Sequence, residues 1–541
     1  MLKIFHFCKK YLSENVLFLY LYVVLCIFSS LFSLLLPITT GNFIDMLASY
    51  SSFRHITYYC TLFIIINLLQ IISGYFSGRL YTKLQMNMGY SFNRDMIQHM
   101  QRVSLRYLKT KDAAYLSQRI NNDTNNLVIF CIGVVQNVII NLLTLLFPLM
   151  ILYQYNASIS WAVAGMVLLY FISYRLTRQP LYGVNLKFQE AQSAFFSRLN
   201  EQLKMAKFIK LQAIAETFIS RLQSSFDHLL SAALRRQKIS YLFTSLDGMI
   251  ATLMQIGLFF IGGYAVIQGD LTIGQFTVVS TYFSMLLSAV RYFFGLGKTV
   301  QESRAAYSRI KELQDIPEQV WGDKTIEKIS TITVSDLSFG YEGKQIFTRY
   351  NLEFIKGNLY AIVGDNGSGK STLINLLMGI YTGEFEGEIF YNHIPLQQLN
   401  LPLVLRNQMG IAEQEPSLLA ASLAYNLTLD EQMHISRDNI EELSAILGLQ
   451  DFFSQLPQGL DSQVNTTTDN LSGGEKQKIA IMRSLLKDPD VLILDEPTSA
   501  MDYKSQKEFI NYLYKIKNEK IIIMISHDFS IVDKCDFCIK L

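Results

Sequence analysis

Apolar residues form long uninterrupted runs in the first 290 residues of the chain and only short runs afterwards. Stretches without Asp, Glu, Lys or Arg cover residues 15–44, 56–78, 124–174, 248–269 and 271–290. An apolar helix of about 20 residues crosses the hydrocarbon core of a bilayer. The third stretch is much longer and is interrupted by QYNAS at 154–158, so it predicts two spans joined by a turn. The pattern therefore predicts six membrane-spanning helices, with a tight loop at Gly269 and Asp270 between the last two.

The positions of Lys and Arg orient these spans across the membrane. The connections at 79–125 and 175–240 are rich in both residues, which predicts that they are cytoplasmic, whereas the other loops contain only Arg54. Both basic connections have helical periodicity, which indicates helices that continue out of the bilayer. At about 1.5 Å per residue, some 25 residues in each direction would carry the chain roughly 35 to 40 Å into the cytoplasm.

The pattern changes after Lys298 to a polar linker and then to short β-rich runs that alternate with helical segments. The runs that predict strands are ITVSDLSF, NLYAIVGD, DVLILDEP and KIIIMISHD. Strands that alternate with helices indicate an α/β domain with a largely parallel sheet. We therefore expect a membrane α-helical bundle at 1–310, a linker at 311–330 and an α/β domain at 331–541.

Composition agrees with this division and limits the partners. Half of the residues are apolar, 17% are charged and the mean hydropathy is +0.22, which is too apolar for an ordinary soluble enzyme of this length. The net charge of +2 argues against a strongly basic surface, so we expect no nucleic-acid partner. The six cysteines predict no disulfide framework, and we interpret the CxxC from Cys535 to Cys538 as strand residues.

A glycine-rich segment of the second domain has the spacing of a phosphate-binding loop. It fits G-x-x-x-x-G-K-[ST] and lies between the apolar run LYAIV and the helical run STLINLLMGI, the context that this motif requires. We expect Lys370 to reach the β- and γ-phosphates of ATP and Ser371 to bind Mg²⁺. The predicted ATP-binding residues of this loop are Gly364, Asp365, Asn366, Gly367, Ser368, Gly369, Lys370, Ser371 and Thr372. The second domain is therefore predicted to be an α/β P-loop NTPase.

Two more strand ends carry side chains suited to phosphate chemistry. VLILDEP places Asp495 where it can hold Mg²⁺ through water, with Glu496 beside it to polarise the attacking water. MISHD places His527 at another strand end, where an imidazole can reach the γ-phosphate. The competing interpretations are a helix-capping acid pair and a structural histidine. The P-loop upstream favours the catalytic interpretation for both.

Together these segments resemble the ATP-binding cassette (ABC) superfamily, and the order of membrane region and then ATPase is similar to its exporter branch. LSGGE at Leu471 to Glu475 matches the signature motif of that superfamily. The resemblance implies that two cassettes stack head to tail. The signature residues Ser472, Gly473 and Gly474 of one cassette would then cap the γ-phosphate held by the P-loop of the other.

The resemblance also suggests roles for single residues outside the P-loop. Tyr341 looks like the aromatic residue that stacks on adenine, and Gln414 resembles the glutamine that senses Mg²⁺ and contributes to the catalytic site. Asp502 ends a segment, SAMD, similar to the loop that runs between the two nucleotide sites. The chain departs from the family before the signature, where VNTTTDN has Thr466 at a position expected to be Glu.

Two cytoplasmic segments look like the coupling elements through which exporters of this superfamily contact their cassettes. They are YLSQRINNDTNNL, at 115–127, and KMAKFIKLQAIAE, at 204–216. The resemblance implies that both dock on a cassette.

One P-loop and one signature predict a half-transporter that embeds in a lipid bilayer and works as a homodimer, with a heterodimer as the alternative. We expect a multi-pass protein of the bacterial plasma membrane, with a cytoplasmic ATPase domain that uses ATP and Mg²⁺. The expected activity is ATP-driven export of a peptide or a small amphipathic or hydrophobic compound. The alternatives are a lipid flippase and an ATP-gated channel or regulator. Asp247 and Arg291, the only charges close to the last two spans, are interpreted as residues near helix ends.

Overall fold

The computed structural model describes residues 1–49, 53–109, 113–177, 179–341, 344–430, 436–464 and 471–541. It divides the chain into two compact units. The membrane unit contains Met1–Gln98 and Ala114–Asp315, and the cassette unit contains His99–Ala113 and Ile316–Leu541. A short cytoplasmic segment of the first half of the chain therefore belongs to the second unit.

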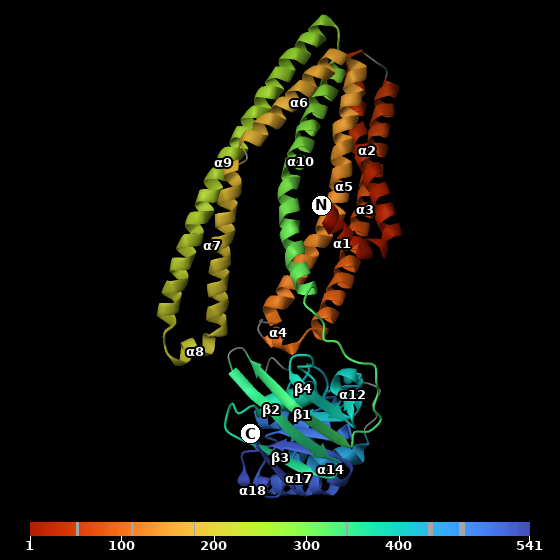
Figure 1. Ribbon diagram of the computed structural model, residues 1–541. Helices are drawn as coiled ribbons and strands as arrows, with labels where there is room; N and C mark the ends of the chain where they lie inside the picture. The colour runs from red at the N-terminus through yellow and green to blue at the C-terminus, as the bar shows by residue number, and fades with distance from the viewer. Residues whose placement is uncertain (50–52, 110–112, 178, 342–343, 431–435, 465–470) are drawn as a thin grey trace. The chain divides into compact units, whose positions relative to one another are not determined.

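Long helices form the membrane unit (Figure 1). They are α1 (Leu2–Ser13), α2 (Val16–Ala48), α3 (Phe53–Arg102), α5 (Ala113–Tyr155), α6 (Ala157–Thr177), α7 (Gln179–Lys204), α8 (Ala206–Leu211), α9 (Ala215–Gln268) and α10 (Ile273–Gln314). Among the described residues, five helices are long and apolar enough to cross a membrane, namely α2, α3, α5, α9 and α10. The described apolar part of α6, Ala157–Ile172, is shorter. With α6 as the sixth helix, the predicted helical bundle is confirmed.

The two predicted turns between spans are present and have clear local causes. Between α5 and α6, the side chain of Asn156 accepts hydrogen bonds from the N–H groups of Ser158 and Ile159 at 2.9 and 3.2 Å, which starts the new helix. Between α9 and α10, Gly269 has φ of +81°, a left-handed conformation that ends a helix. Thr272 then caps α10 through a reciprocal pair of hydrogen bonds with Gln275.

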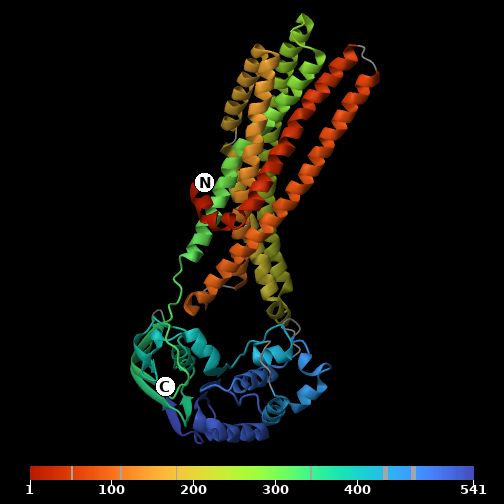
Figure 2. The ribbon, with the colours of Figure 1, turned by 90° about the vertical axis from the view of Figure 1, so that its right-hand side faces the viewer.

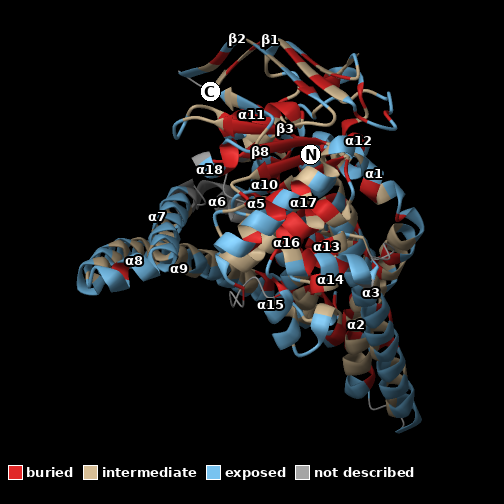
Figure 3. Ribbon diagram, turned by 90° about the horizontal axis from the view of Figure 1, so that it is seen from below, coloured by how far each residue is buried: buried red, intermediate tan, exposed pale blue. Residues whose placement is uncertain are grey.

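The basic connections are helical, as predicted. Figures 1 and 2 show α7 and α9 as an extended antiparallel pair with the short helix α8 at its tip. The side chains along this pair are largely exposed (pale blue in Figure 3). KMAKFIKLQAIAE, the second expected coupling element, spans α8 and the turns on either side of it.

A segment that precedes the first expected coupling element belongs to the cassette unit. Residues 115–127 continue helix α5, and the segment that packs on the cassette contains α4 (Leu105–Lys109). The hydroxyl of Ser104 donates to the carboxylate of Glu384, and Arg106 lies 3.7 Å from the same carboxylate. The N–H of Gln319 donates to the carbonyl of Arg102 at 2.8 Å. Residues 115–127 continue a membrane helix, and their docking on a cassette stays a prediction.

Two sheets form the framework of the cassette unit. The parallel sheet has the order β6-β7-β8-β3-β9, and the antiparallel sheet has the order β2-β1-β4-β5. The strands are β1 (Thr331–Tyr341), β2 (Lys344–Ile355), β3 (Leu359–Val363), β4 (Glu386–Tyr391), β5 (Ile394–Pro395), β6 (Met409–Ala412), β7 (Val491–Asp495), β8 (Ile521–Ile525) and β9 (Phe537–Lys540). All four predicted strands exist. ITVSDLSF, however, lies in the antiparallel sheet, because β1 pairs with β2 and β4.

The parallel sheet is buried on both faces. Alternate residues of β8 enter different core clusters, with Ile521, Ile523 and Ile525 in one and Ile522 and Met524 in the other. The helices described in this unit besides α4 are α11 (Lys370–Leu377), α12 (Leu401–Asn407), α13 (Leu423–Thr428), α14 (Arg437–Ile446), α15 (Gln450–Gln455), α16 (Gly473–Leu486), α17 (Tyr503–Ile516) and α18 (Phe529–Val532). Figure 3 shows buried residues in red along β3, β8 and α11. This burial fixes the strand ends from which the site is built.

In the membrane unit, α2 and α10 touch through their backbones. A Cβ atom added at Gly274 would lie 2.0 Å from the carbonyl oxygen of Gly41 and 2.5 Å from Cγ of Asp45. The N–H of Gly274 also donates to the Asp45 carboxylate at 2.7 Å. Small residues of this kind allow close helix packing in membranes, where lipid provides no hydrophobic driving force between helices.

We predict that Gly274→Ala destabilises the membrane unit by about 1 to 3 kcal/mol, because the added methyl group must push α2 and α10 apart. The matched control is Gly78→Ala on α3, where an added Cβ has no heavy atom within 4 Å. That control should be neutral or slightly stabilising, since Ala is a better helix former than Gly. Thermal unfolding of both purified variants in the same detergent checks this. Equal melting temperatures for the two variants would contradict the close contact.

Candidate functional site

The P-loop connects β3 to α11 and relies on its glycines. Gly367 and Gly369 have φ of +82° and +107°, in the left-handed region that glycine adopts readily. A Cβ atom at Gly369 would also lie 2.5 Å from Cγ2 of Ile346. The amine of Lys370 donates to the carbonyls of Gly364 at 2.8 Å and Asp365 at 3.0 Å. The loop therefore turns back over the start of the helix, as its motif predicts.

Two buried polar groups of this loop fit an anionic ligand. Lys370 is 9% exposed, and its charged amine donates hydrogen bonds to two neutral carbonyls. The hydroxyl of Ser368 is buried and, among the described residues, has no hydrogen-bond partner. A buried cation needs a counter-charge and a buried hydroxyl needs a partner. Phosphate oxygens would supply both.

Three polar side chains meet beyond the ends of neighbouring parallel strands. Glu496 follows β7, and its carboxylate accepts a hydrogen bond from Nε2 of Gln414, after β6, at 2.9 Å. Nε2 of His527, after β8, lies 3.4 Å from the other carboxylate oxygen. Since β6, β7 and β8 are adjacent, their carboxyl ends share one edge of the sheet. The structure thus brings together the three side chains that were predicted to be catalytic.

Asp495 is the last residue of β7, and its surroundings shift the pKa of its carboxyl group. Burial, reinforced by the adjacent Glu496, raises the pKa of Asp495, while Lys370 and a hydrogen bond with Ser371 act in the opposite direction. A bound cation would favour the ionised carboxylate. Mg²⁺ prefers oxygen ligands and usually takes one or two from the protein. The Ser371 hydroxyl and the Asp495 carboxylate are a fitting pair.

The signature segment begins α16. Ser472 caps the helix, because its hydroxyl accepts from the N–H of Glu475 at 3.2 Å, while the Glu475 carboxylate accepts from the N–H of Ser472 at 2.7 Å. Ser472 and Gly473 are exposed and Gly474 is half-buried. No hydrogen bond of these three residues reaches the P-loop within the described part of the chain. Their surface is therefore available to another molecule.

Sequence reasoning missed one residue of the site, Gln477. It lies on the buried face of α16, and its Nε2 donates to the carbonyl of Glu496 at 2.8 Å. The hydroxyl of Ser499 donates to the same carbonyl at 3.0 Å. Gln477 was part of the signature segment NLSGGEKQK, but its spacing alone gave no sign that it reaches a strand end. It joins the signature helix to the backbone of Glu496.

Of the other residues suggested by the family resemblance, Tyr341 lies beside the P-loop helix and Asp502 lies at the start of α17. The hydroxyl of Tyr341 lies 3.3 Å from that of Thr372 and 3.2 Å from that of Tyr381, so Tyr341 borders the P-loop helix with its ring 38% exposed. Asp502 instead caps α17, where it accepts from the N–H of Ser505 at 2.9 Å. This bond holds the pKa of Asp502 below its usual range. Thr466 lies outside the described residues.

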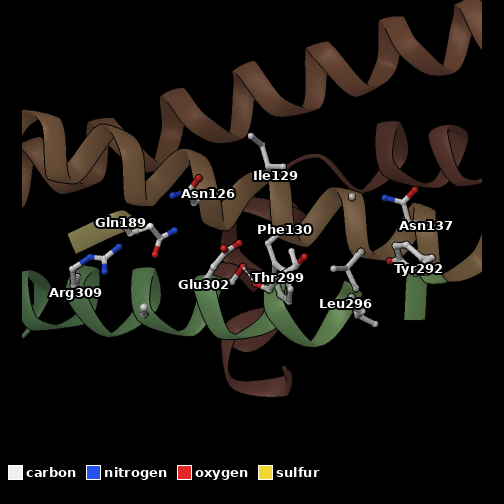
Figure 4. A pocket seen from close by; sticks show the side chains of 14 residues that line it. Asn126, Ile129, Phe130, Asn137, Gln189, Tyr292, Leu296, Thr299, Glu302 and Arg309 are labelled. Carbon is white, nitrogen blue, oxygen red and sulfur yellow. Dashed lines mark hydrogen bonds between the residues drawn. The ribbon is translucent and has the colours of Figure 1, made fainter. Parts of the chain in front are cut away.

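A cavity of about 600 Å³ opens in the membrane unit between α5, α7 and α10 (Figure 4). Figure 4 shows Arg309, Glu302 and Gln189 gathered at one end and Tyr292 and Asn137 at the other. Nε of Arg309 donates to the buried carboxylate of Asp123 at 2.7 Å, so this cation is neutralised by a partner. Glu302 pairs with Lys298 at 3.5 Å. The cavity is polar at one end without a strong net charge.

Asp247 and Arg291 pair with one another. Their side chains lie 3.0 Å apart, and the hydroxyl of Tyr170 contacts both. Each residue adjoins an apolar stretch but lies inside a continuous helix, α9 or α10, so neither is at a helix end. The ion pair connects α6, α9 and α10 and has a structural explanation.

Comparison with known proteins agrees with this geometry. Residues 19–290 match the family model "ABC transporter transmembrane region", and residues 347–499 match the model "ABC transporter". The chain belongs to the ABC transporter family.

A relative from Syntrophus aciditrophicus, named ATP-dependent lipid A-core flippase, is 26% identical over 88% of this chain and 80% of its own length. A flippase of the same name from Shewanella oneidensis is 32% identical, but the matched region spans only 50% of this chain and 45% of the relative. A solved structure of a bacterial Atm1-family ABC exporter with ATP bound has a TM-score of 0.80 at 21% identity. It covers 98% of this chain and 93% of that chain, so the two share a fold.

The family and the fold define an exporter-type half-transporter with one membrane region and one ATP-binding cassette. It is an ATP-hydrolysing transporter and a multi-pass protein of the bacterial inner membrane, with its ATPase domain in the cytoplasm.

We predict that Glu496→Gln lowers steady-state ATP hydrolysis by about 10²- to 10⁴-fold, because it removes the base that would accept a proton from water. The P-loop is unchanged, so the affinity for ATP should stay within about threefold of wild type. Steady-state ATPase rates and equilibrium binding of labelled ATP measure the two quantities. The matched control is Glu508→Gln on the exposed face of α17, which should keep full activity. Hydrolysis by Glu496→Gln at the wild-type rate would show that another group is the base.

Proposed function

We propose that the chain is one subunit of a homodimeric ABC exporter that uses ATP and Mg²⁺ to move an amphipathic lipid across the membrane. The cluster of Glu496, Gln414 and His527 beside the P-loop carries the proposal that ATP is hydrolysed, since these are the groups that hydrolysis needs. The lipid substrate is supported by the relatives, which are named lipid A-core flippases. These names favour a lipid over the peptide or small hydrophobic compound expected from the sequence.

The role proposed for each side chain of the cassette site follows from its contacts. The P-loop and Lys370 bind the phosphates of ATP, while Ser371, Asp495 and Gln414 hold Mg²⁺. When bound there, Mg²⁺ would supply positive charge to neutralise the phosphate oxygens. Glu496 takes a proton from the attacking water, and the hydrogen bond from Gln414 holds its carboxylate in place.

His527 and Tyr341 complete the nucleotide contacts. The imidazole of His527 is half-exposed beside the Glu496 carboxylate, from where it donates a hydrogen bond to the γ-phosphate. The ring of Tyr341 provides a surface on which adenine stacks. Tyr341 ends β1 of the antiparallel sheet and His527 follows β8 of the parallel sheet, so each is positioned by a strand end.

The dimer is proposed from the exposed signature. Ser472 and Gly473 face solvent and have no bond to the P-loop within the described part of the chain, so they are free to cap an ATP held by a partner. Asp502 lies on the loop that would run between the two sites. One chain supplies every residue that such a composite site needs, which favours two identical chains over a heterodimer.

The lipid proposal is tested with the full-length dimer in liposomes that contain a fluorescent phospholipid. We predict ATP-dependent redistribution of that lipid between the leaflets, measured by quenching with dithionite. Glu496→Gln should abolish the redistribution, which separates pumping from passive scrambling. An ATP-gated channel would pass solute only down its gradient. The lipid proposal is wrong if ATP hydrolysis is normal, no lipid moves, and a peptide or hydrophobic dye accumulates against its gradient. That result would support the export of a peptide or drug that the sequence predicted.

The composite site is tested by mixing chains. Ser472→Arg places a long cation where the γ-phosphate would bind, and Lys370→Ala weakens binding to the P-loop, so each variant alone should be inactive. In a mixed dimer, sites shared between chains leave one site with both defects and the other with none. We therefore predict partial ATPase activity from purified mixed dimers.

If both motifs served the same chain, each site would hold one defect and mixing would restore nothing. Mixed dimers would also be inactive if turnover required two intact sites. A crosslink between the two motifs therefore tests directly whether they belong to different chains. A cysteine at 472 should crosslink to a cysteine at 367 of the partner in the presence of ATP. Crosslinks found only within one chain would overturn the composite site.

A further inference from the structure

The turn that follows α11 places a second tyrosine, Tyr381, against Tyr341. The hydroxyl groups of the two tyrosines lie 3.2 Å apart. On its other side, the hydroxyl of Tyr341 lies 3.3 Å from the hydroxyl of Thr372 on α11. Three hydroxyl groups therefore form a row that connects the exposed end of β1 to the P-loop helix and to the interior of the cassette.

The two tyrosines differ in how freely their rings can move. Tyr341 is 38% exposed at the end of β1, whereas Tyr381 is fully buried in a hydrophobic core cluster of the cassette. The rings of Tyr381 and Phe339 meet the ring of Tyr341 at 83° and 84°, with centroids 6.2 and 5.3 Å away. Interiors are close-packed, so a buried ring has one fixed position. Tyr381 is therefore a fixed support for the exposed ring of Tyr341.

Core packing explains the ring of Tyr381 but not the direction of its hydroxyl. A buried hydroxyl needs a hydrogen-bond partner. In the same core cluster, the hydroxyl of Tyr391 donates to the backbone carbonyl of Leu377, which is an ordinary structural bond. The hydroxyl of Tyr381 instead meets a side chain at the border of the nucleotide site, and Tyr341 is its only hydrogen-bond partner among the described residues.

The hydroxyl of Tyr381 is suited to donate this hydrogen bond. Burial raises the pKa of Tyr381, and the neighbouring Tyr341 and Glu384 act in the same direction, so the hydroxyl keeps its proton at neutral pH. A hydroxyl group has one proton to donate and two lone pairs that accept. The hydroxyl of Tyr341 can therefore accept from Tyr381 and donate to Thr372 at the same time.

These two bonds hold an exposed side chain in one orientation before any ligand binds. An exposed aromatic side chain without such bonds samples several rotamers. Ordering one side chain on binding weakens the affinity by about two- to tenfold. A ring that is already ordered avoids this loss, so the bonds of Tyr341 would strengthen the binding of anything that stacks on it.

We propose that Tyr381 is a positioning residue of the nucleotide site, whose hydroxyl holds the ring of Tyr341 in the orientation on which adenine stacks. The proposal rests on the proposed function, in which Tyr341 stacks on adenine, and it adds a residue that does not itself touch the nucleotide. The bond between the two tyrosines then contributes to binding of the base. It does not contribute to binding of the phosphates, which the P-loop holds.

The test removes single hydroxyl groups and compares two probes. Tyr381→Phe keeps the ring and should weaken ATP binding about three- to tenfold, while the affinity for inorganic triphosphate, which has no base, stays within about twofold. Tyr341→Phe breaks the same bond from the exposed side, without disturbing the core, and should weaken ATP binding at least as much. Isothermal titration calorimetry of the full-length dimer in detergent measures both affinities, with EDTA present to prevent hydrolysis.

The matched control is Tyr391→Phe, which also removes a buried hydroxyl from the same core cluster. It should lower the melting temperature about as much as Tyr381→Phe and leave the affinity for ATP unchanged. A double variant tests the route of the effect, because changes to residues that act through one another do not add. In the Tyr341→Phe background, Tyr381→Phe should cause no further loss of ATP affinity.

Three results would each overturn the proposal: unchanged ATP affinity in Tyr381→Phe, an equal loss for ATP and triphosphate, or an equal loss in Tyr391→Phe. A full additional loss in the Tyr341→Phe background would overturn it as well. Failure of the stacking role is read separately from Tyr341→Ala. If that variant binds ATP as the wild type does, the stacking is rejected and the role of Tyr381 with it. If Tyr341→Ala weakens ATP binding and Tyr381→Phe does not, adenine stacks on Tyr341 without help from Tyr381.

Discussion

The hydrogen bonds that meet at Glu496 are the interaction on which the rest of the cassette depends. Gln414 holds its carboxylate at 2.9 Å, and Gln477 holds its carbonyl at 2.8 Å. These partners come from the segment after β6 and from α16, so a shift of either element moves the carboxylate. Because the exposed residue Ser472 caps α16, anything that binds the signature acts on the same helix. Through Gln477, α16 thus connects the surface proposed for a partner's ATP to the backbone of the proposed base in this chain's own site.

The membrane unit depends on a different constraint, the need to pack helices without help from the hydrophobic effect. It uses backbone contact at Gly274, the ion pair of Asp247 with Arg291, and the buried Asp123 with Arg309. The first and the last of these join helices that are distant in the sequence, whereas the pair of Asp247 with Arg291 joins the consecutive helices α9 and α10. The cavity of Figure 4 is lined by residues from three helices, α5, α7 and α10. The charged side chains at its polar end, Glu302 and Arg309, each pair with a residue of opposite charge.

Much of the fold followed from local patterns in the sequence. Charge-free stretches predicted the spanning helices, and the apolar runs before Asp495 and His527 predicted the strands whose ends form the site. The prediction of a largely parallel sheet did not reveal that β1 lies in a second, antiparallel sheet, although a usable signal was present. Burial in β1 alternates at Ile332 and Val334, as in a strand with one buried face, whereas all of β8 is buried.

Other features had no local signal. The contacts of Arg102 and Ser104 with the cassette depend on Gln319 and Glu384, which lie more than two hundred residues away in the chain. Gln477 is a polar residue on a helix, and only the packing of that helix beside β7 reveals its bond to Glu496. The cavity of Figure 4 requires the three-dimensional bundle. Long-range contacts between unlike elements are the part of this structure that periodicity and motif spacing do not encode.

The backbone of Glu496 has one more consequence. Its φ is +48°, a left-handed conformation that costs a side chain with a Cβ atom about 1 kcal/mol or more. Glycine would adopt this left-handed conformation without strain. The residue that best suits the backbone here therefore differs from the carboxylate proposed for ATP hydrolysis. Selection for thermal stability alone would therefore replace the carboxylate at this position. With Glu496 as the proposed base, this position is one where the protein gives up stability for activity.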